Sequence, residues 1–357
     1  MIELFGWSDA LRASFAPHAV RGYSPARVVA QHRDLWRLIS DNGEIAGRLS
    51  GRFALDAAPG EHPVVGDWLA ISQADATSEA VIHALMARTS AFTRRAAGDG
   101  GVQVVAANVN VAFLVTALNG DLNLRRMERY LVATHDSGAV PVIVLTKADL
   151  SADPEAEVQR VVDIAGGAAV VALSSVTGVG LDALSQWLKP GVTAALLGSS
   201  GAGKSTLLNA LAGRLLMETG AIREGDDRGR HTTTHRELFR LPSGAMLVDT
   251  PGMRELGLLA VDTALDASFE DVTDLMINCR FGNCSHANEP GCAVLGARAD
   301  GTLPEERWQA YLKLERELAF NARKDDPNIE AAKRTRWKQI HKAQRAKVRR
   351  RLRDEES

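Results

Sequence analysis

The stretch Gly198-Ser199-Ser200-Gly201-Ala202-Gly203-Lys204-Ser205-Thr206 decides the fold of this 357-residue chain. It lies between the apolar run TAALL and the helix-favouring run STLLNALAG, and it matches the complete phosphate-loop pattern G-x-x-x-x-G-K-[ST]. Its glycines let backbone N–H groups curl around a phosphate, and the start of the helix adds the positive end of its dipole. We therefore expect all nine residues to contact a nucleotide, with Lys204 at the β- and γ-phosphates and Ser205 as a ligand of Mg²⁺.

The sequence around this loop alternates between expected strands and helices from about residue 103 onward. The apolar runs VNVAFLVTAL, PVIVL and AAVVAL are separated by the helix-like runs RRMERYLVATHD and EAEVQRVVDIA. Continuous apolar strands separated by helices are typical of a parallel sheet that is covered on both faces. The pattern predicts a doubly wound α/β domain, for which we set the bounds 89–262.

Residues 1–88 have a different texture, with short β-like runs separated by turn signals. The runs are ARVVAQ, LWRLIS, EIAGRLSG, GDWLAIS and EAVIHAL, and Asp41-Asn42-Gly43 between the second and third favours a tight hairpin. This predicts a small five-stranded barrel of the OB type, a fold that commonly binds RNA. Phe53 and Trp68 suit either the barrel core or base stacking, and Arg88, Arg94 and Arg95 are candidate phosphate contacts.

Two motifs upstream of the phosphate loop suit the recognition of guanine. Thr146-Lys147-Ala148-Asp149 ends an expected strand, so the Asp149 carboxylate can accept hydrogen bonds from N1–H and the exocyclic amine of guanine while the Lys147 stem packs over the base. Ser174-Ser175 follows the next expected strand, and a backbone N–H there can meet the guanine O6. Each motif alone is equally typical of an ordinary turn or helix start, so the prediction rests on their combination.

Downstream of the loop, Asp249-Thr250-Pro251-Gly252 follows the run AMLV. Asp249 is expected to hold Mg²⁺ through water, and the Gly252 N–H to contact the γ-phosphate. Between the two motifs lies Gly229-Arg230-His231-Thr232-Thr233-Thr234-His235. One threonine of this segment would complete the Mg²⁺ shell in the triphosphate state; we assign Thr232 and Thr233 to the nucleotide and Thr233 to Mg²⁺.

The order of these motifs is unusual, because both base-reading motifs precede the phosphate loop. Ordinary small GTPases begin with the phosphate loop and end with the base readers. The set resembles a circularly permuted GTPase domain, and together with the barrel, the HTTT segment and a cysteine cluster it resembles the RsgA (YjeQ) family over nearly the full chain. This resemblance implies a GTPase that binds GTP and GDP, acts in late maturation of the small ribosomal subunit, contacts its rRNA, and carries a zinc-binding domain after the GTPase domain.

Two positions depart from the common GTPase pattern. Thr146 stands where many GTPases have asparagine, which predicts one hydrogen bond fewer at the nucleotide site. Met253 stands where Ras-type enzymes have the glutamine that orients the attacking water, and a thioether cannot do this. We expect slow intrinsic hydrolysis, with His231 positioning the water and Lys204 and Gly252 completing the catalytic groups; the alternative for His231 is a solvated loop side chain.

The three cysteines of the chain form a cluster with one histidine. Cys279-x4-Cys284-x-His286-x5-Cys292 supplies three thiolates and an imidazole within 14 residues. This is the ligand number and softness of a closed tetrahedral zinc site, which leaves no open position for catalysis. The spacing predicts one structural Zn²⁺ in a C-terminal helical domain, for which we set the bounds 263–357; unligated cysteines beside a chance histidine are the alternative.

The charge distribution adds an expected partner. The chain has a net charge of −2, but Lys333–Arg353 contains 11 Lys or Arg and no Asp or Glu. Such a segment is expected to bind RNA phosphates. An acidic protein partner is an alternative, and a membrane surface is less favoured because the apolar face is thin. With no apolar run of about 20 residues and no signal-peptide pattern at the start, we expect a cytoplasmic monomer that does not enter a membrane.

Two other functional classes remain open from the residues themselves. If Thr146 and Asp149 only cap a turn, an ATP-using phosphate-loop enzyme or kinase fits as well. A pure RNA-binding protein with a vestigial nucleotide site is the other, although the intact Lys204, Ser205 and Asp249 argue against it.

Overall fold

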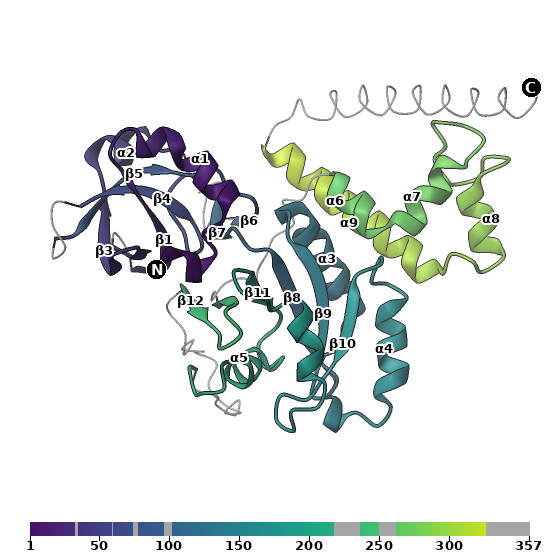
Figure 1. The fold of residues 1–357 in the computed structure, drawn as a ribbon. Coiled ribbons are helices and arrows are strands. Elements are labelled where there is room, and N and C mark those ends of the chain that lie inside the picture. The colour runs from purple at the N-terminus through teal and green to yellow at the C-terminus, as the bar shows by residue number, and fades with distance from the viewer. Residues whose placement is uncertain are drawn as a thin grey trace, which may run out of the picture. The chain divides into compact units, whose positions relative to one another are not determined.

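A computed structural model describes residues 1–32, 35–58, 60–73, 78–95, 102–217, 236–249 and 262–325 (Figure 1). The chain divides into two compact units, Met1–Gly257 and Leu258–Ser357. The first holds a barrel and an α/β sheet, and the second holds a group of helices. None of the described helices has the length and apolar character that crossing a membrane requires.

The N-terminal part of the first unit is a closed five-stranded barrel, as the sequence predicted. A short 3-10 helix η1 (Ile2–Phe5) and helix α1 (Asp9–Ala19) precede it. The barrel contains β1 (Ser24–His32), β2 (Leu35–Ser40), β3 (Gly43–Leu49), α2 (Gly51–Asp56), β4 (Trp68–Ser72) and β5 (Ala80–Leu85). The strand order is β1-β2-β3-β5-β4, and a β1–β4 pairing closes the ring. The β3–β5 pair is parallel and the others are antiparallel.

The barrel closes around apolar side chains that its strands contribute. Val28, Leu38, Leu69 and Ile82 are all fully buried. The expected hairpin forms where Ser40 pairs with Gly43, whose φ of +115° suits glycine. Trp68 belongs to this core at 3 % exposure, so its alternative role as an exposed base-stacking residue is wrong.

A two-stranded hairpin, β6 (Ala91–Arg95) and β7 (Val102–Ala107), leads from the barrel to the α/β part. The α/β elements are β8 (Val111–Ala117), α3 (Leu124–Ser137), β9 (Val140–Thr146), η2 (Ala148–Leu150), α4 (Pro154–Val162), β10 (Ala169–Ala172), η3 (Leu181–Gln186), β11 (Thr193–Leu197), α5 (Lys204–Ala212), β12 (Arg236–Arg240) and β13 (Met246–Asp249). The strand order is β10-β9-β8-β11-β13-β12, and only β12 runs antiparallel to its neighbour in this part.

Both faces of this sheet are covered, which explains its continuous apolar strands. Every residue of β8 and β11 is buried. Met127 and Leu131 of α3 pack with one set of strand side chains, whereas Leu207 and Leu208 of α5 pack with the set that points to the opposite face. The doubly wound, mostly parallel sheet predicted from the sequence is confirmed.

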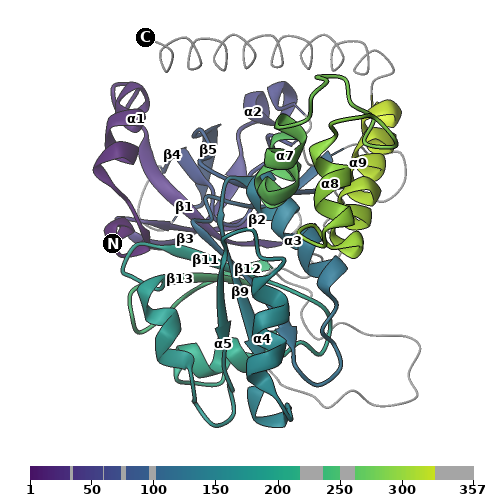
Figure 2. The ribbon, with the colours of Figure 1, turned by 90° about the vertical axis from the view of Figure 1, so that its right-hand side faces the viewer.

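The barrel and the α/β part share a single 11-stranded sheet, because β12 also pairs with β1 (Figure 2). The register places Ala30 opposite Glu237 and Gln31 opposite Arg236. An ion pair also joins β12 to the next barrel strand: Arg37 Nη2 of β2 lies 2.6 Å from Glu237 Oε1 of β12. Backbone hydrogen bonding therefore connects the barrel directly to the strand that follows the expected switch segment.

A buried arginine ties the two parts together more deeply. Arg27 of β1 is 2 % exposed, and its guanidinium donates to the Phe5 and Gly66 carbonyl oxygens and, from Nη2, to Thr193 Oγ1 at 2.8 Å. It also lies 5.2 Å from the centre of the Trp68 ring. Desolvation lowers the pKa of Arg27 to about 10. Thr193 begins β11, the strand that leads into the phosphate loop.

Arg88, a candidate phosphate contact, is instead held inside the protein. Its Nη2 and Nε bond both oxygens of the fully buried Asp67, at 2.7 and 2.8 Å. Burial raises the pKa of Asp67, and the arginine opposes this effect. The expectation that Arg88 is free to bind RNA phosphate is therefore wrong, because its charge already compensates a buried carboxylate.

The second unit contains α6 (Asp262–Ser268), α7 (Glu270–Ile277), α8 (Ala293–Ala299) and α9 (Glu305–Asp325). Phe269, Trp308 and Tyr311 are buried between them. Arg307 stacks 4.0 Å from the Phe269 ring centre and pairs with Asp271 at 2.8 Å. The cysteine-rich loop lies between α7 and α8, so these helices form its support.

Replacing Arg27 with methionine tests the tie between the barrel and β11. The Arg27→Met variant leaves three buried acceptors without their donor, so we expect the free energy of unfolding to fall by about 3 kcal/mol. Urea denaturation followed by tryptophan fluorescence measures this change. The control is Arg52→Met, whose side chain is 92 % exposed; equal stability of the two variants would contradict the role of Arg27.

Candidate functional site

The phosphate loop begins where the chain passes close to the neighbouring strand. Gly198 has a φ of +152°, and a Cβ there would lie 2.1 Å from the Val115 carbonyl oxygen of β8. The loop ends at Gly203, which precedes α5 with a φ of +90°. Both positions require glycine, and between them the loop leads into the N-terminus of α5, where backbone N–H groups can bind an anion.

Lys204 reaches back over this loop. Its Nζ donates to the carbonyl oxygens of Gly198 at 2.8 Å and Ser199 at 2.5 Å. Ser205 and Thr206 lie half-buried in the first turn of α5, and Ser200 and Gly201 are exposed at the loop's tip. The ammonium group is thus held by the loop whose N–H groups would surround a phosphate.

Thr146, the last residue of β9, connects the base-reading motif to the phosphate loop. Its side chain is buried, and its Oγ1 donates to the Ala202 carbonyl oxygen at 2.6 Å and approaches the Thr116 carbonyl oxygen at 3.3 Å. The sequence predicted that threonine here loses a hydrogen bond to the nucleotide. In the structure the hydroxyl group is used to hold the loop's backbone.

The two base-reading motifs lie beside each other, since β9 and β10 are parallel neighbours. Ala148 N donates to the Leu173 carbonyl oxygen at 3.2 Å, which joins the two loops directly. Asp149 is exposed and Lys147 is half-buried. Ser174 is buried and its Oγ accepts from Thr177 N at 3.2 Å.

Ser175 Oγ is enclosed and has no hydrogen-bond partner among the described residues. A buried hydroxyl without a partner is costly. It is therefore available to a polar group of a ligand that enters between the two loops.

Asp249 ends β13, the parallel neighbour of β11, and is half-buried. The carboxyl ends of adjacent parallel strands meet at one edge of a sheet, so Asp249 and the phosphate loop share that edge. The predicted residues His231, Thr232, Thr233 and Gly252 lie outside the described residues. Their assigned roles stay predictions.

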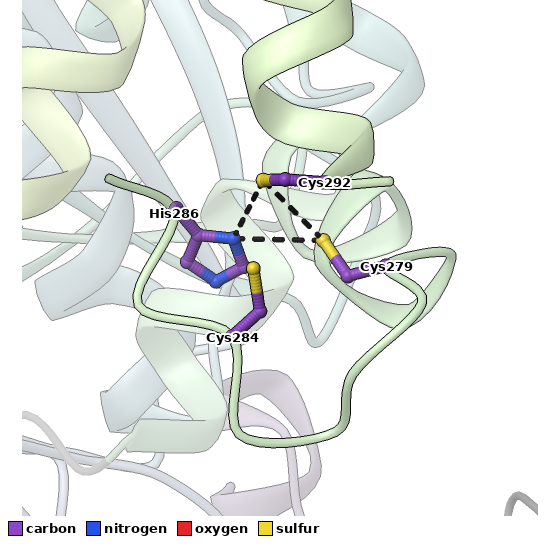
Figure 3. A group of neighbouring side chains, drawn as sticks. All are labelled: Cys279, Cys284, His286 and Cys292. Carbon is purple, nitrogen blue, oxygen red and sulfur yellow. Dashed lines mark hydrogen bonds between the residues drawn. The ribbon is translucent and has the colours of Figure 1, made fainter. Parts of the chain in front are cut away.

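The four predicted zinc ligands come together in the second unit (Figure 3). Their ligand atoms all lie within 4.8 Å of one another. His286 Nδ1 is 3.5 Å from the sulfur atoms of Cys279 and Cys292, and those two sulfur atoms are 3.8 Å apart. In a tetrahedral site with Zn–S bonds of about 2.3 Å and Zn–N bonds of about 2.1 Å, two sulfur atoms lie about 3.8 Å apart, and a sulfur and a nitrogen atom about 3.6 Å apart. The cluster therefore fits one Zn²⁺.

The protonation chemistry of the cluster also suits a cation. Burial, together with the neighbouring thiols, raises the pKa of Cys284 to about 12, so the thiolate of Cys284 needs a positive charge nearby to form. Burial lowers the pKa of His286, which favours the neutral imidazole that binds metals.

Glu289 shapes the loop that carries two of these ligands. Its Oε1 accepts from Ser285 N at 2.8 Å and from Ser285 Oγ, and its Oε2 accepts from the N–H groups of Ala287 and Asn288 at 3.1 and 3.2 Å. The carboxylate therefore holds the residues on both sides of His286, which has a φ of +58°. This left-handed conformation turns the chain so that Nδ1 faces the two sulfur atoms.

Two residues that shape these sites were not predicted from the sequence: Glu289, and Asp121, whose carboxylate accepts from Ser199 Oγ at 2.6 Å. Glu289 left one signal, because it lies inside the ligand spacing beside Pro290 and Gly291. Asp121 is separated from Ser199 by 78 residues and left none.

Comparisons with known proteins agree with this geometry. Residues 85–259 match the family described as RsgA GTPase. The chain is 48 % identical to the small ribosomal subunit biogenesis GTPase RsgA of Opitutus terrae over 98 % of both chains, and 41 % identical to its namesake from Methanosarcina acetivorans over 94 % of this chain and 90 % of that one.

Two solved structures share the fold. YjeQ from Thermotoga maritima is 27 % identical with a TM-score of 0.64, and the match covers 83 % of this chain and 99 % of that one. YloQ, described as a circularly permuted GTPase, is 24 % identical with a TM-score of 0.60, covering 83 % of this chain and 95 % of that one.

The Thr146 hydroxyl provides a direct test of the loop geometry. In Thr146→Val the Ala202 carbonyl loses its donor, so we expect the Kd for GDP to rise about tenfold. Thr146→Ser keeps the hydroxyl and should stay within about twofold of the parent chain. Isothermal calorimetry measures both; equal affinities of the two variants would show that the hydroxyl does not organise the loop.

Glu289→Ala tests the organisation of the cysteine cluster. The Glu289 carboxylate accepts hydrogen bonds from four donors of the loop around His286, and the variant removes this acceptor. We therefore expect zinc affinity to fall about tenfold. Competition with a chromophoric chelator on the full chain measures it. Glu306→Ala, which removes an exposed glutamate of α9, is the matched control and should retain the parent affinity.

Proposed function

The chain belongs to the RsgA GTPase family, and from this premise we propose that it is a GTPase of small ribosomal subunit biogenesis. It binds the small subunit, assists its late maturation, and hydrolyses GTP to GDP and phosphate, with the subunit stimulating the hydrolysis. The named relatives of Opitutus and Methanosarcina support this assignment, since each is described as a small ribosomal subunit biogenesis GTPase.

One observation carries the guanine-nucleotide part of the proposal. The Thr146 hydroxyl donates to Ala202 in the phosphate loop at 2.6 Å, so the loop expected to read the base and the loop expected to hold the phosphates are fixed to each other. The motifs lie 56 residues apart in a permuted order. Their convergence at one sheet edge is what a GTPase site requires, and an aspartate that only caps a turn does not explain it.

The base and the phosphates are assigned to different groups of residues. Asp149 and Lys147 hold the guanine with Ser174 and Ser175, as the adjacency of the two loops supports. Gly198–Thr206 hold the phosphates, and Thr232 contacts the triphosphate state. Mg²⁺ is held by Ser205, Thr233 and, through water, Asp249.

Hydrolysis proceeds by in-line attack of water on the γ-phosphorus. The bond between this phosphorus and the β,γ-bridging oxygen breaks, GDP leaves, and the proton of the attacking water passes to the phosphate product. Lys204 and the loop N–H groups stabilise the charge that develops on the phosphate oxygens, and the Gly252 N–H contacts the γ-phosphate. His231 orients the attacking water.

The three parts have separate tasks in this proposal. The barrel (1–88) and the basic segment Lys333–Arg353 contact rRNA, the GTPase domain (89–262) binds the nucleotide, and the C-terminal domain (263–357) is folded around one structural zinc. Loss of the γ-phosphate loosens the Asp249–Gly252 motif and the zinc-binding segment that follows it, which re-aims the RNA-binding ends and releases the subunit. The protein acts as a monomer in the cytoplasm.

Phosphate release from GTP and from ATP, each with and without purified small subunits, tests the function. We expect turnover selective for GTP that rises at least about tenfold with subunits. In the same assay His231→Ala should lose most of the stimulation while keeping its affinity for GDP.

Three outcomes would overturn parts of the proposal. Turnover that favours ATP would support a different phosphate-loop enzyme, and no turnover with either nucleotide would support an RNA-binding protein with a vestigial site. GTP turnover that ignores the subunits would remove the ribosomal partner but not the GTPase.

A further inference from the structure

An acidic side chain from outside every nucleotide motif contacts the phosphate loop. Ser199 Oγ donates to Asp121 Oδ2 at 2.6 Å. Asp121 lies in the turn between β8 and α3, and β8 is the strand that Gly198 packs against. The first two residues of the loop are therefore held by one strand and by the turn that follows it.

The turn holds Asp121 in place through several hydrogen bonds. Arg126 Nη2 bonds Asp121 Oδ1 at 2.7 Å and the Asp121 carbonyl oxygen at 2.5 Å. Asn123 caps α3, since its Oδ1 accepts from Arg126 N at 3.0 Å. The two oxygens of the carboxylate thus have different partners, the guanidinium of Arg126 and the hydroxyl of Ser199.

The contact continues from Ser199 to Lys204. The Ser199 side chain is bonded to Asp121, and its carbonyl oxygen accepts from Lys204 Nζ at 2.5 Å. The orientation of this carbonyl fixes one of the hydrogen bonds that the Lys204 ammonium group donates to the loop. A shift of Ser199 would therefore change the direction in which Lys204 reaches the phosphates.

The ion pair between Arg126 and Asp121 explains how a carboxylate can lie beside a loop that is expected to bind an anion. An unpaired negative charge near a polyphosphate would repel it. Arg126 compensates the charge of Asp121, and the side chains are 33 % and 26 % exposed, so this charge is only partly screened by water. The pair gives the Ser199 hydroxyl a strong, charge-assisted acceptor without adding net charge to the site.

We propose that Asp121 is a positioning residue for nucleotide binding and hydrolysis, which acts through Ser199 on the phosphate-binding Lys204. The proposal rests on the proposed GTPase function. It assigns Asp121 no contact with the nucleotide, only the orientation of the loop that makes the contact.

The test compares Asp121→Ala, Ser199→Ala and the double variant in the full chain. Each single variant removes the same hydrogen bond, so we expect each to raise the Kd for a fluorescent GDP analogue about tenfold, and the double variant to show no further increase. Because Lys204 also stabilises the transition state, kcat should fall together with the affinity. Additive effects in the double variant would overturn the proposal.

Asp121→Asn and Asp153→Ala are the matched controls. The asparagine keeps an oxygen that accepts from Ser199, so we expect it to recover most of the affinity. Asp153 ends another strand–helix connection and caps α4 by accepting from Ala156 N at 3.0 Å. Its replacement should lower the melting temperature but leave the Kd for GDP unchanged, which separates general destabilisation from positioning.

The parent chain separates this inference from the proposed function. If the parent does not bind GDP, the proposed function fails. If the parent binds GDP, and Asp121→Ala and Ser199→Ala both bind GDP as tightly as the parent does, only the role of Asp121 is overturned. A loss of folded protein in Asp121→Ala leaves Ser199→Ala to decide, because a serine-to-alanine change removes one oxygen atom from a half-buried side chain.

Discussion

The phosphate loop is held by hydrogen bonds from two residues outside it, Thr146 and Asp121, and from its own Lys204. Thr146 binds the Ala202 carbonyl, Asp121 binds the Ser199 side chain, and Lys204 binds the carbonyls of Gly198 and Ser199. A glycine-rich loop has high conformational entropy when it is free, so a ligand would have to order it on binding. External contacts supply that order in advance, which lowers the entropic cost of binding the phosphates.

The two contacts from outside the loop come from the last residue of β9 and from the turn that follows β8, its parallel neighbour. The order of the motifs along the chain changes, but the order of the strands in the sheet brings the same carboxyl ends together. The permutation also gives the sheet a new neighbour, since β12 pairs with β1 of the barrel and Arg27 reaches Thr193 at the start of β11. The barrel is thus hydrogen-bonded to two strands of the α/β part, β12 and β11, and β11 leads directly into the phosphate loop.

The cysteine cluster applies the same principle with a different chemistry. Three thiols and one imidazole provide the ligands, but the Glu289 carboxylate, which holds the backbone on both sides of His286, gives the imidazole its direction. Hydrogen bonds lower the pKa of Glu289 to about 2, and the two from Ser285 have the largest effect. The carboxylate therefore stays ionised over the pH range in which zinc proteins function. A group that binds neither metal nor nucleotide organises each site, Glu289 in one and Asp121 in the other.

Local sequence patterns determined the elements and most of the chemistry of this protein. The phosphate loop, the Asn42-Gly43 hairpin and the four zinc ligands could be predicted because each depends on residues close together in the chain, where backbone geometry leaves few alternatives. Tertiary structure alone decided the contacts between distant residues. Asp121 meets Ser199 across 78 residues and Arg27 meets Thr193 across 166, and Arg88 is bonded to a buried aspartate instead of facing solvent. No periodicity encodes such pairs, because strand order and register bring them together, and these follow from the packing of the whole sheet.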